Sequence, residues 1–298
     1  MTLQYRDNKN NTLSLIQYLL RFIAHILSRS RYITSFSREI VRHHDNDAFA
    51  DISSNGEKKV IQFMTNLNKS GCFADIGFNK GDYSKEILNE GFYGKLLIVD
   101  PLESNITSPL PDTTAEIIKA QVALLEEIGE SVIYHNIDEE LSGTDSLIKQ
   151  IEYSEVELEY QEQVKFEDRT TLIPVKVDTL DSLAMQLKLE YFNFIKIDVE
   201  GAELAVLKGA ESLISEGKID YIQLEFGHAC RAARTTLFDI YRFLAKYNYQ
   251  MYVIKPGGIE LTSFSPWLEN RYSYINLFFA KKELRDKLTD LEYKSSLI

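Results

Sequence analysis

The fold of this chain is decided by residues 72–84, Cys-Phe-Ala-Asp-Ile-Gly-Phe-Asn-Lys-Gly-Asp-Tyr-Ser. An apolar run that ends at Asp75 is followed by Gly77 and Gly81, and a helical pattern begins at Ser84. This order is typical of a buried strand that leads into a helix through a glycine turn. Glycine lets the backbone approach a ligand closely, and the first helical turn presents free N–H groups to it.

The spacing of the two glycines favours a cofactor without a pyrophosphate. Gly77 and Gly81 form Gly-x-x-x-Gly, whereas the dinucleotide fingerprint Gly-x-Gly-x-x-Gly has a third glycine that makes room for the phosphates. A nucleoside without phosphates, such as S-adenosylmethionine, therefore fits better than NAD. A simple turn between a strand and a helix explains the same two glycines about equally well.

The composition is that of an acidic globular protein. Of its 298 residues, 44% are hydrophobic and 26% are charged, and the formal net charge is −12. The length suits one large α/β domain with appendages as well as it suits two domains. A negative field repels polyanions, so nucleic acid is excluded as an expected partner. Cys72 and Cys230 stand in no metal-binding spacing, which favours a reducing, cytoplasmic location.

Residues 12–33 carry the pattern of one amphipathic helix. Apolar residues recur at helical spacing, and Arg21 and His25 interrupt them. The segment is therefore too short and too polar to span a bilayer, and it lacks the cleavage site of a secretory signal. We expect it to pack on the rest of the chain or on a second subunit in a homo-oligomer. Contact of its basic face with an anionic membrane is the less favoured alternative.

Several later strands end in acidic residues. Residues 95–99 read as a buried strand followed by Asp100, whose carboxylate is placed to accept hydrogen bonds from a ribose. A turn before Pro101 explains Asp100 equally well. A second strand is followed by Asp198 and Glu200. Charges cost free energy at such places unless they are paired or used.

The remaining pattern alternates strands with helices. It predicts strands at residues 115–124 and 130–135, helices at 203–215 and 232–247, and two final strands, 249–255 and 274–280, joined across the turn 256–258. The acidic stretch between Asp138 and Asp168 reads as a twisted hairpin. Together these elements predict a doubly wound α/β sheet with its ligand crevice at the C-terminal ends of the strands.

The order of the motifs resembles the FkbM family of S-adenosylmethionine-dependent methyltransferases. The resemblance covers about residues 55–281, and its motifs are DIGFNKGDYS (75–84), VDP (99–101), VDTLDSL (177–183) and IKIDVEGAE (195–203). It implies a seven-stranded, Rossmann-like sheet whose last strand is antiparallel. It also implies O-methylation of a hydroxyl on a small molecule or glycan.

The resemblance also implies roles for individual residues. The amino acid end of the cofactor would be lined by Asp75, Gly77, Asn79 and Gly81, next to Phe78, and Tyr83 and Ser84 would open the following helix. Asp100, followed by Pro101, would hold the ribose, Gln121 and Val122 would border the adenine, and Asp198 would face the methionine near the sulfonium. Two positions depart from the family: Phe78 replaces the usual alanine and narrows the expected pocket, and Asp100 replaces the usual glutamate.

Methyl transfer to a hydroxyl needs a base, and the crevice offers several. The candidates are His228, Glu225, Glu200 and Asp198. We favour His228, because an imidazole titrates near physiological pH; a surface histidine that caps a helix is an equally simple interpretation. Glu225 would orient His228, bind a substrate hydroxyl or pair with Lys196. The carboxylates also suit a magnesium ion, but their spacing does not demand one and no metal is expected.

Two other function classes compete with this expectation. The chain could be a scaffold protein that keeps the fold without turnover, or a nicotinamide-dependent oxidoreductase, which the missing third glycine disfavours. The expected domains are a helical extension (1–54), a methyltransferase domain (55–282) with an acidic hairpin insertion at about 136–172, and a charged tail (283–298).

Overall fold

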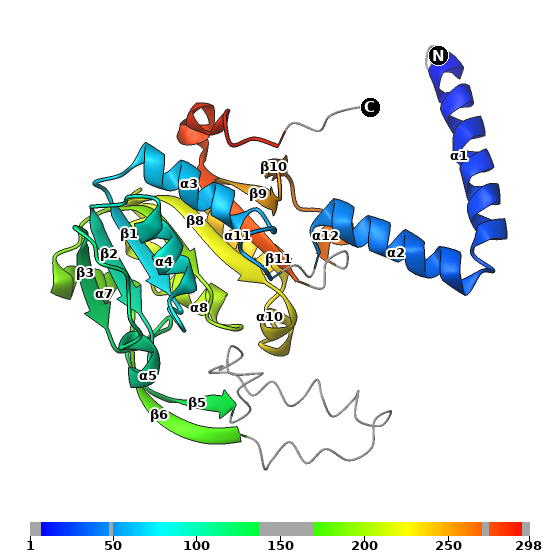
Figure 1. The fold of residues 1–298 in the computed structure, drawn as a ribbon. Helices are drawn as coiled ribbons and strands as arrows, with labels where there is room; N and C mark the ends of the chain where they lie inside the picture. The colour runs from blue at the N-terminus through cyan, green and yellow to red at the C-terminus, as the bar shows by residue number, and fades with distance from the viewer. Residues whose placement is uncertain (1–6, 48–49, 137–169, 270–273, 294–298) are drawn as a thin grey trace, which may run out of the picture. The chain divides into compact units, whose positions relative to one another are not determined.

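The computed structural model describes residues 7–47, 50–136, 170–269 and 274–293 (Figure 1). The chain divides into two compact units, with the boundary between Asp47 and Ala48. The N-terminal unit is helical, and the second unit, called the body below, holds the α/β sheet.

The N-terminal unit contains two helices, α1 (Asp7–Leu27) and α2 (Arg31–Asp45). The single helix predicted over residues 12–33 is therefore wrong. Ser28 donates its hydroxyl to the His25 carbonyl (2.9 Å), and the Ser30 hydroxyl accepts from the Ile33 N–H (3.4 Å) as the N-cap of α2. Serine hydroxyls that bond to nearby backbone groups compete with helix continuation and favour a break here. No helix in the described ranges is long and apolar enough to cross a membrane.

The main sheet of the body has eight strands among the described residues, in the order β10-β9-β11-β8-β7-β1-β2-β3. The five strands from β8 to β3 are parallel, and β11 lies antiparallel between β8 and β9. The predicted doubly wound sheet with an antiparallel last strand is confirmed. The strands are β1 (Cys72–Ile76), β2 (Lys95–Val99), β3 (Glu116–Ala120), β7 (Phe192–Ile197), β8 (Ile219–Phe226), β9 (Tyr249–Lys255), β10 (Gly258–Thr262) and β11 (Ile275–Lys281).

Strand β10 is an addition to the predicted seven. The glycine turn after β9 leads into β10, not into the last strand as predicted. The chain after the 3₁₀ helix η3 (Lys282–Leu288) then covers β10: the Ile259 N–H donates to the Leu291 carbonyl (2.9 Å), and the Tyr293 N–H donates to the Ile259 carbonyl (2.7 Å). The predicted charged tail thus protects an edge of the sheet, and Leu288 and Leu291 are buried.

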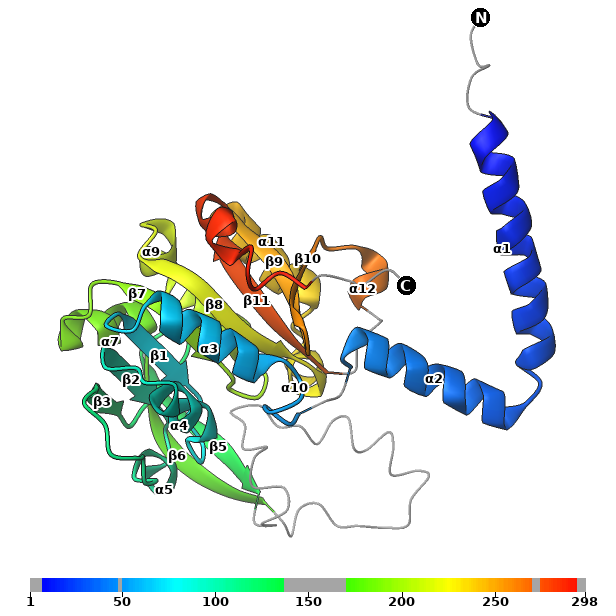
Figure 2. The same ribbon diagram turned by 45° about the horizontal axis from the view of Figure 1, so that its top comes forward.

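Helices cover both faces of the sheet, as the alternation of strand residues requires. Phe73 and Phe194 enter one apolar core, whereas Ala74 and Ile195, the next residues along β1 and β7, enter the other. Figure 2 shows α3 and α4 in front of the sheet, on the face of Phe73. The helices are α3 (Glu57–Leu67), α4 (Asp82–Asn89), α5 (Glu103–Ile106), α7 (Leu180–Leu187), α8 (Glu203–Lys208), α9 (Glu211–Ser215), α10 (His228–Ala232), α11 (Leu237–Lys246) and α12 (Pro266–Glu269).

Two predicted helices are each divided in the structure. The helix predicted at 203–215 breaks between α8 and α9 at Gly209, where a Cβ would lie 2.0 Å from the Leu125 carbonyl oxygen. The range predicted as one helix at 232–247 falls in two: Ala232 ends α10, and α11 begins only at Leu237, because Thr236 and Asp239 form a capping box there.

A second, three-stranded sheet has the order β4-β6-β5. It contains β4 (Ala123–Leu124), β5 (Gly129–Asn136) and β6 (Thr170–Asp178), so the strand predicted at 115–124 is divided between β3 and β4. Strands β5 and β6 pair antiparallel. They border the predicted acidic hairpin, of which residues 137–169 lie outside the described part of the chain.

Candidate cofactor and catalytic site

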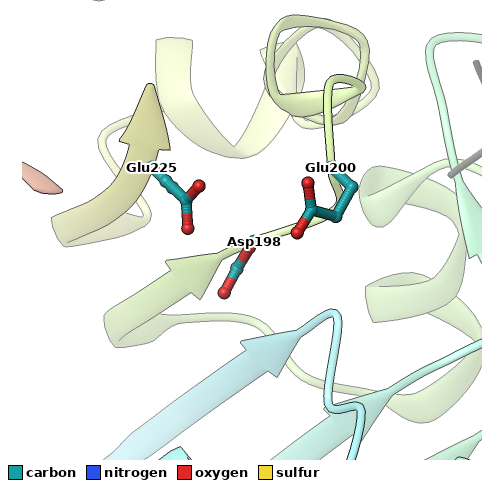
Figure 3. A group of neighbouring side chains, drawn as sticks. All are labelled: Asp198, Glu200 and Glu225. Carbon is teal, nitrogen blue, oxygen red and sulfur yellow. The ribbon is translucent and has the colours of Figure 1, made fainter. Parts of the chain in front are cut away.

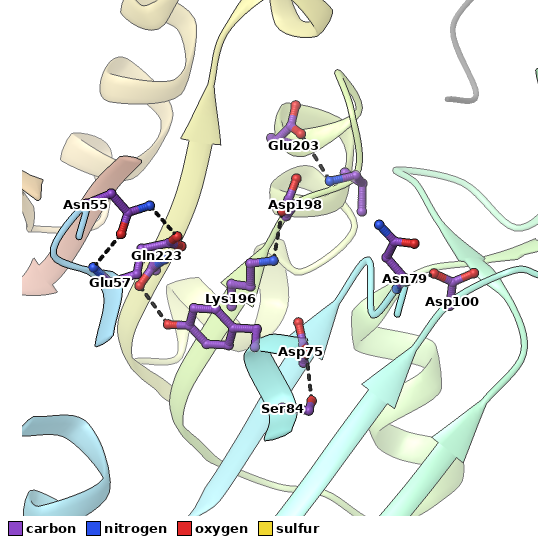
Figure 4. A network of polar contacts seen from close by, with 12 residues as sticks. Asn55, Glu57, Asp75, Asn79, Ser84, Asp100, Lys196, Asp198, Glu203 and Gln223 are labelled. Carbon is purple, nitrogen blue, oxygen red and sulfur yellow. Dashed lines mark hydrogen bonds and ion pairs between the residues drawn. The ribbon is translucent and has the colours of Figure 1, made fainter. Parts of the chain in front are cut away.

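The strand ends that carry the predicted residues meet at one edge of the main sheet. In the register, Ile76 pairs with both Val99 and Ile197, and Ile197 pairs with Leu224. Parallel strands that end at the same level bring the residues after them together. The structure thus brings Gly77, Asp100 and Asp198 together, with Glu225 beside Asp198. Figure 4 shows Asp100 and Asp198, and Figure 3 shows Asp198 with Glu225.

Gly77 is required by the backbone around it. Its φ is +88°, and a Cβ would lie only 1.7 Å from the carbonyl oxygen of Asp198. The Gly77 N–H donates to the Val99 carbonyl (2.9 Å), while the Asp198 N–H donates to the Ile76 carbonyl (2.8 Å). Gly77 therefore allows the ends of β1, β2 and β7 to approach each other, which is the structural condition for a shared site.

Phe78 does not block this site. Its side chain is buried in the core beneath α4, and its ring takes the space beside Gly81, where a Cβ would lie 2.3 Å from the ring. Gly81 also has a positive φ (77°), so its backbone conformation and the Phe78 ring both favour glycine at this position. Phe78 is absent from the wall of the cavity described next, contrary to the expectation that it narrows that pocket.

A cavity lies at the ends of β1, β2 and β7. Six of the residues predicted to bind the cofactor line it: Gly77, Asn79, Asp100, Pro101, Val122 and Asp198. The sequence analysis did not predict several other residues of the wall, among them Leu102, Asn105, Leu124, Ile133 and Val199. Glu200, which was predicted as a catalytic residue, also lines the wall. Valine, leucine and isoleucine side chains form one part of this wall, and carboxylate and amide groups form another.

Asp100 holds the turns around the cavity together. One carboxylate oxygen accepts from the Asn79 N–H (2.9 Å), and the other accepts from the Leu102 N–H (2.9 Å) and the Asn105 side-chain amide (3.1 Å). Asp100 is buried, although it contributes to the cavity wall. Its role in the fold is therefore to fix the positions of Asn79 and Asn105 beside the same hollow.

The other predicted cofactor residues lie outside the cavity wall. Tyr83 is buried and donates to Gln223 (2.7 Å), and the exposed Gln121 donates to the Pro101 carbonyl (3.4 Å). Ser84 donates to Asp75 (2.6 Å), and the second carboxylate oxygen of Asp75 is buried without a hydrogen-bond partner. Burial raises the pKa of Asp75. Figure 4 shows Asp75 next to Lys196 and Asp198.

A buried network of polar side chains supports the site from below (Figure 4). Lys196 donates to Asp198 (2.8 Å), and its ammonium lies 5.0 Å from the centre of the Tyr83 ring. Burial alone disfavours the ammonium, but the nearby acids, first of all Asp198, raise the pKa of Lys196. Glu57 accepts from Gln223 (2.6 Å) and Asn55 (2.7 Å), and burial raises its pKa. Lys196 therefore remains charged and neutralises part of the acidic site.

A second hollow adjoins the cavity. We call it the cleft, and it shares Gly77, Asn79 and Asp198 with the cavity. The rest of its wall carries acids, two lysines and aromatic rings: Asp51, Glu57, Phe78, Lys80, Asp82, Tyr83, Lys196 and Tyr274, with Ala50 and Ile52. Asp198 thus stands where two hollows of different character meet.

Three carboxylates surround this meeting point (Figure 3). Asp198, Glu200 and Glu225 each place an oxygen within 4.8 Å of the others, in the one group of described residues with the spacing of cation ligands. Burial, and then repulsion from Asp198 and Glu200, raise the pKa of Glu225 well above its usual range. Tyr274 hydrogen-bonds to Glu225. A raised pKa makes a carboxylate a stronger proton acceptor than an ordinary surface carboxylate.

Backbone geometry fixes the position of Glu200. It has a left-handed conformation (φ 52°), which non-glycine residues rarely adopt outside functional or tight turns. The buried Glu203 stabilises this turn, because one of its oxygens accepts from the Val199 N–H (3.2 Å) and the Gly201 N–H (3.1 Å). His228 is an exposed residue at the start of α10, outside the group of three carboxylates, and neither His228 nor Glu225 lines the cavity or the cleft.

Comparisons with solved structures give weak similarity to several methyltransferases. The plantazolicin methyltransferase BpumL in complex with SAH is 10% identical, with 90% of this chain and 100% of that chain covered and a TM-score of 0.39. An O-methyltransferase from Bacillus cereus in complex with SAH is 13% identical, with 88% and 96% covered and a TM-score of 0.37. The N-methyltransferase NodS from Bradyrhizobium japonicum is 7% identical, with 78% and 98% covered and a TM-score of 0.37. TM-scores this low decide nothing about this chain.

Sequence comparisons are more decisive. No curated protein matches the chain. The model of the Methyltransferase FkbM domain matches residues 71–251, a range that runs from the start of β1 into β9. Because this match spans more than half of the chain and contains the glycine turn and the acidic strand ends of the site, the protein belongs to the FkbM methyltransferase family.

Proposed function

We propose that this protein transfers the methyl group of S-adenosylmethionine to a hydroxyl group of a sugar, a glycan or a related metabolite. The observation that carries the proposal is the meeting of the cavity and the cleft at Asp198. A methyltransferase must hold two molecules end to end, so that the acceptor oxygen faces the transferred carbon. Two adjoining hollows with a shared wall suit that requirement.

The cavity residues fit S-adenosylmethionine. Its apolar wall, with Val122, Leu124 and Ile133, suits an adenine ring, and Asn79 and Asn105 offer polar groups to a ribose. The carboxylates of Asp198 and Glu200 complement a positively charged sulfonium. When bound, the cofactor would supply an activated methyl group.

The cleft suits a polyhydroxylated acceptor. Carboxylates accept hydrogen bonds from hydroxyl groups, and Lys80 donates them. The ring of Tyr274, which is half-buried, offers apolar surface to the C–H face of a sugar. These features support a sugar or glycan over an apolar acceptor.

We assign the base to Glu225, with His228 as the alternative. Glu225 lies beside Asp198, where the two hollows meet, and its raised pKa brings proton acceptance closer to neutral pH. In its ionised form it would take the proton of the acceptor hydroxyl, while Tyr274 holds its carboxylate in place. Since a base must be deprotonated, the rate is expected to increase as the pH rises through the pKa of Glu225.

Calorimetry with S-adenosylmethionine and with NAD tests the cofactor. We expect binding of the former, at least about tenfold weaker in Asp198→Asn because the complementary charge is lost. The matched control Asp290→Asn changes an exposed aspartate of the tail and should bind normally. Binding of NAD alone would contradict the proposal, and binding of neither would favour a scaffold protein.

Transfer of a labelled methyl group to sugars and extracted glycans tests the reaction and its base. Glu225→Gln is expected to lower the rate about 10²- to 10⁴-fold, the usual contribution of a general base, and to retain cofactor binding. Loss of rate in His228→Ala with full activity in Glu225→Gln would assign the base to His228. Labelled product that carries the methyl on nitrogen would contradict O-methylation.

A further inference from the structure

The N-terminal unit exposes an unusual number of large apolar side chains. Within residues 18–41, twelve of them are exposed: Tyr18, Leu19, Leu20, Phe22, Ile23, Ile26, Leu27, Tyr32, Ile33, Phe36, Ile40 and Val41. Tyr32 is 88% exposed and Phe36 is 67% exposed. The described residues from 50 to 293 expose only ten, which are scattered over many elements. Exposed apolar surface of this extent indicates an interaction site.

Each of the two helices has distinct apolar and polar sides. On α2, Tyr32, Phe36 and Ile40 recur every four residues and form one side. Arg31 and Arg38 lie on the opposite side, so the helix is strongly amphipathic. The two helices follow one another in Figure 1.

On α1 the apolar side is wider. Gln17, Arg21 and His25 recur every four residues as a narrow polar strip, and large apolar side chains take most of the remaining circumference from Tyr18 to Leu27. A helix with a wide apolar side and a narrow basic strip is typical of segments that lie in a membrane interface.

The charges of this segment are opposite in sign to those of the rest of the chain. Residues 1–47 contain seven Arg and Lys against four Asp and Glu, whereas residues 48–298 contain 26 against 41. Basic residues beside an apolar surface attract anionic lipid headgroups.

We propose that α1 and α2 bind the surface of an anionic phospholipid membrane. Their apolar sides would enter the boundary between headgroups and acyl chains, while the arginines contact lipid phosphates through their long side chains. The charge distribution favours lipid over a second copy of the chain, because a symmetric dimer through this segment would bring like charges together. This inference is independent of the proposed reaction.

Flotation of the full chain with lipid vesicles tests the proposal. We expect binding to vesicles of phosphatidylcholine mixed with phosphatidylglycerol, weaker binding to phosphatidylcholine alone, and a decrease with added salt. Absence of binding to the mixed vesicles would overturn the proposal, as would equal binding to both vesicle types.

Paired variants separate the apolar and the electrostatic contributions. Tyr32→Ser with Phe36→Ser should lower binding to both vesicle types at least about tenfold, because two exposed rings no longer enter the interface. Arg31→Gln with Arg38→Gln should lower binding to the mixed vesicles alone, by about tenfold or more. These side chains are exposed, so circular dichroism and melting should match the parent protein.

Matched controls come from the body. Met185→Ser removes a side chain that is 76% exposed, and Arg242→Gln removes an exposed arginine, and both should bind vesicles normally. Controls that lose as much binding as the paired variants would overturn the proposal. Light scattering provides a further test. If the parent protein is a dimer that does not bind lipid, and the double variant Tyr32→Ser with Phe36→Ser is a monomer, the proposal is overturned and the surface is assigned to a second copy of the chain.

Discussion

The body and the N-terminal unit use apolar and charged residues in opposite ways. The body buries rings such as Phe194 and also buries charges, among them Asp75 and Lys196. The N-terminal unit leaves Phe36 and most of its arginines exposed. The apolar content of a segment therefore does not by itself indicate whether its side chains form a core or remain exposed. In the body it creates the fold, and in α1 and α2 it remains accessible to a partner.

The largest expected effect concerns the close approach of strands in the body. Gly77→Ala should cost about 4 kcal/mol or more, because the new Cβ would overlap the Asp198 carbonyl oxygen. Gly91→Ala is the matched control: Gly91 also has a positive φ (81°), but a Cβ there meets no atom within 4 Å, so only about 1 kcal/mol is expected. Urea unfolding followed by circular dichroism measures both, and equal losses would contradict the account of Gly77.

The comparison itself is tested by two phenylalanines. Phe194→Ala should lower the free energy of unfolding by about 3–5 kcal/mol, because Phe194 is fully buried and its ring lies against those of Phe73 and Phe278. Phe36→Ala should change it by less than about 0.5 kcal/mol. A large loss for Phe36→Ala in urea unfolding would mean that the side chain supports the fold, and the contrast between the two units would fail.

A smaller effect of opposite sign is expected at Glu225. Because burial raises its pKa, the folded state favours the protonated form, and stability falls as the pH rises from the unfolded pKa through the folded pKa. Glu225→Gln is neutral at every pH and should raise the free energy of unfolding at neutral pH by about 0.5–2 kcal/mol. Melting curves across pH provide the measurement. If the stability of the variant depends on pH as that of the parent protein does, Glu225 is not the group whose ionisation destabilises the folded state.

The smallest effects are expected at two helix caps. Thr236→Ala removes the capping box of α11 in the body and should cost about 1 kcal/mol of global stability. Ser30→Ala removes the N-cap hydrogen bond of α2, which is long (3.4 Å) and therefore weak. The loss of helicity should be confined to the N-terminal unit. Amide hydrogen exchange distinguishes the two results. Loss of protection in the main sheet of the Ser30→Ala variant would show that the units unfold together.

The sequence by itself determined the central strands and the candidate acids. Buried parallel strands are continuous apolar runs, so β1, β2 and β7 were predictable within about one or two residues. Asp198, Glu200 and Glu225 were recognised because charged residues directly follow or end such runs. The break between α1 and α2 had a local signal in Ser30, which sequence reasoning overlooked. The division at Gly209 had a weaker local signal, because its cause is the carbonyl group of Leu125, which is distant in the sequence.

Only the tertiary structure decided where the side chains point and which of them meet. Gln223 bonds to Glu57 across 166 residues of sequence, and this contact holds the network beneath Asp198. Phe78 turns into the core, and Glu225, not His228, lies beside Asp198 and Glu200. The physical reason is that local patterns fix the period of a strand or helix, whereas side-chain direction and pKa depend on neighbours that only folding brings together.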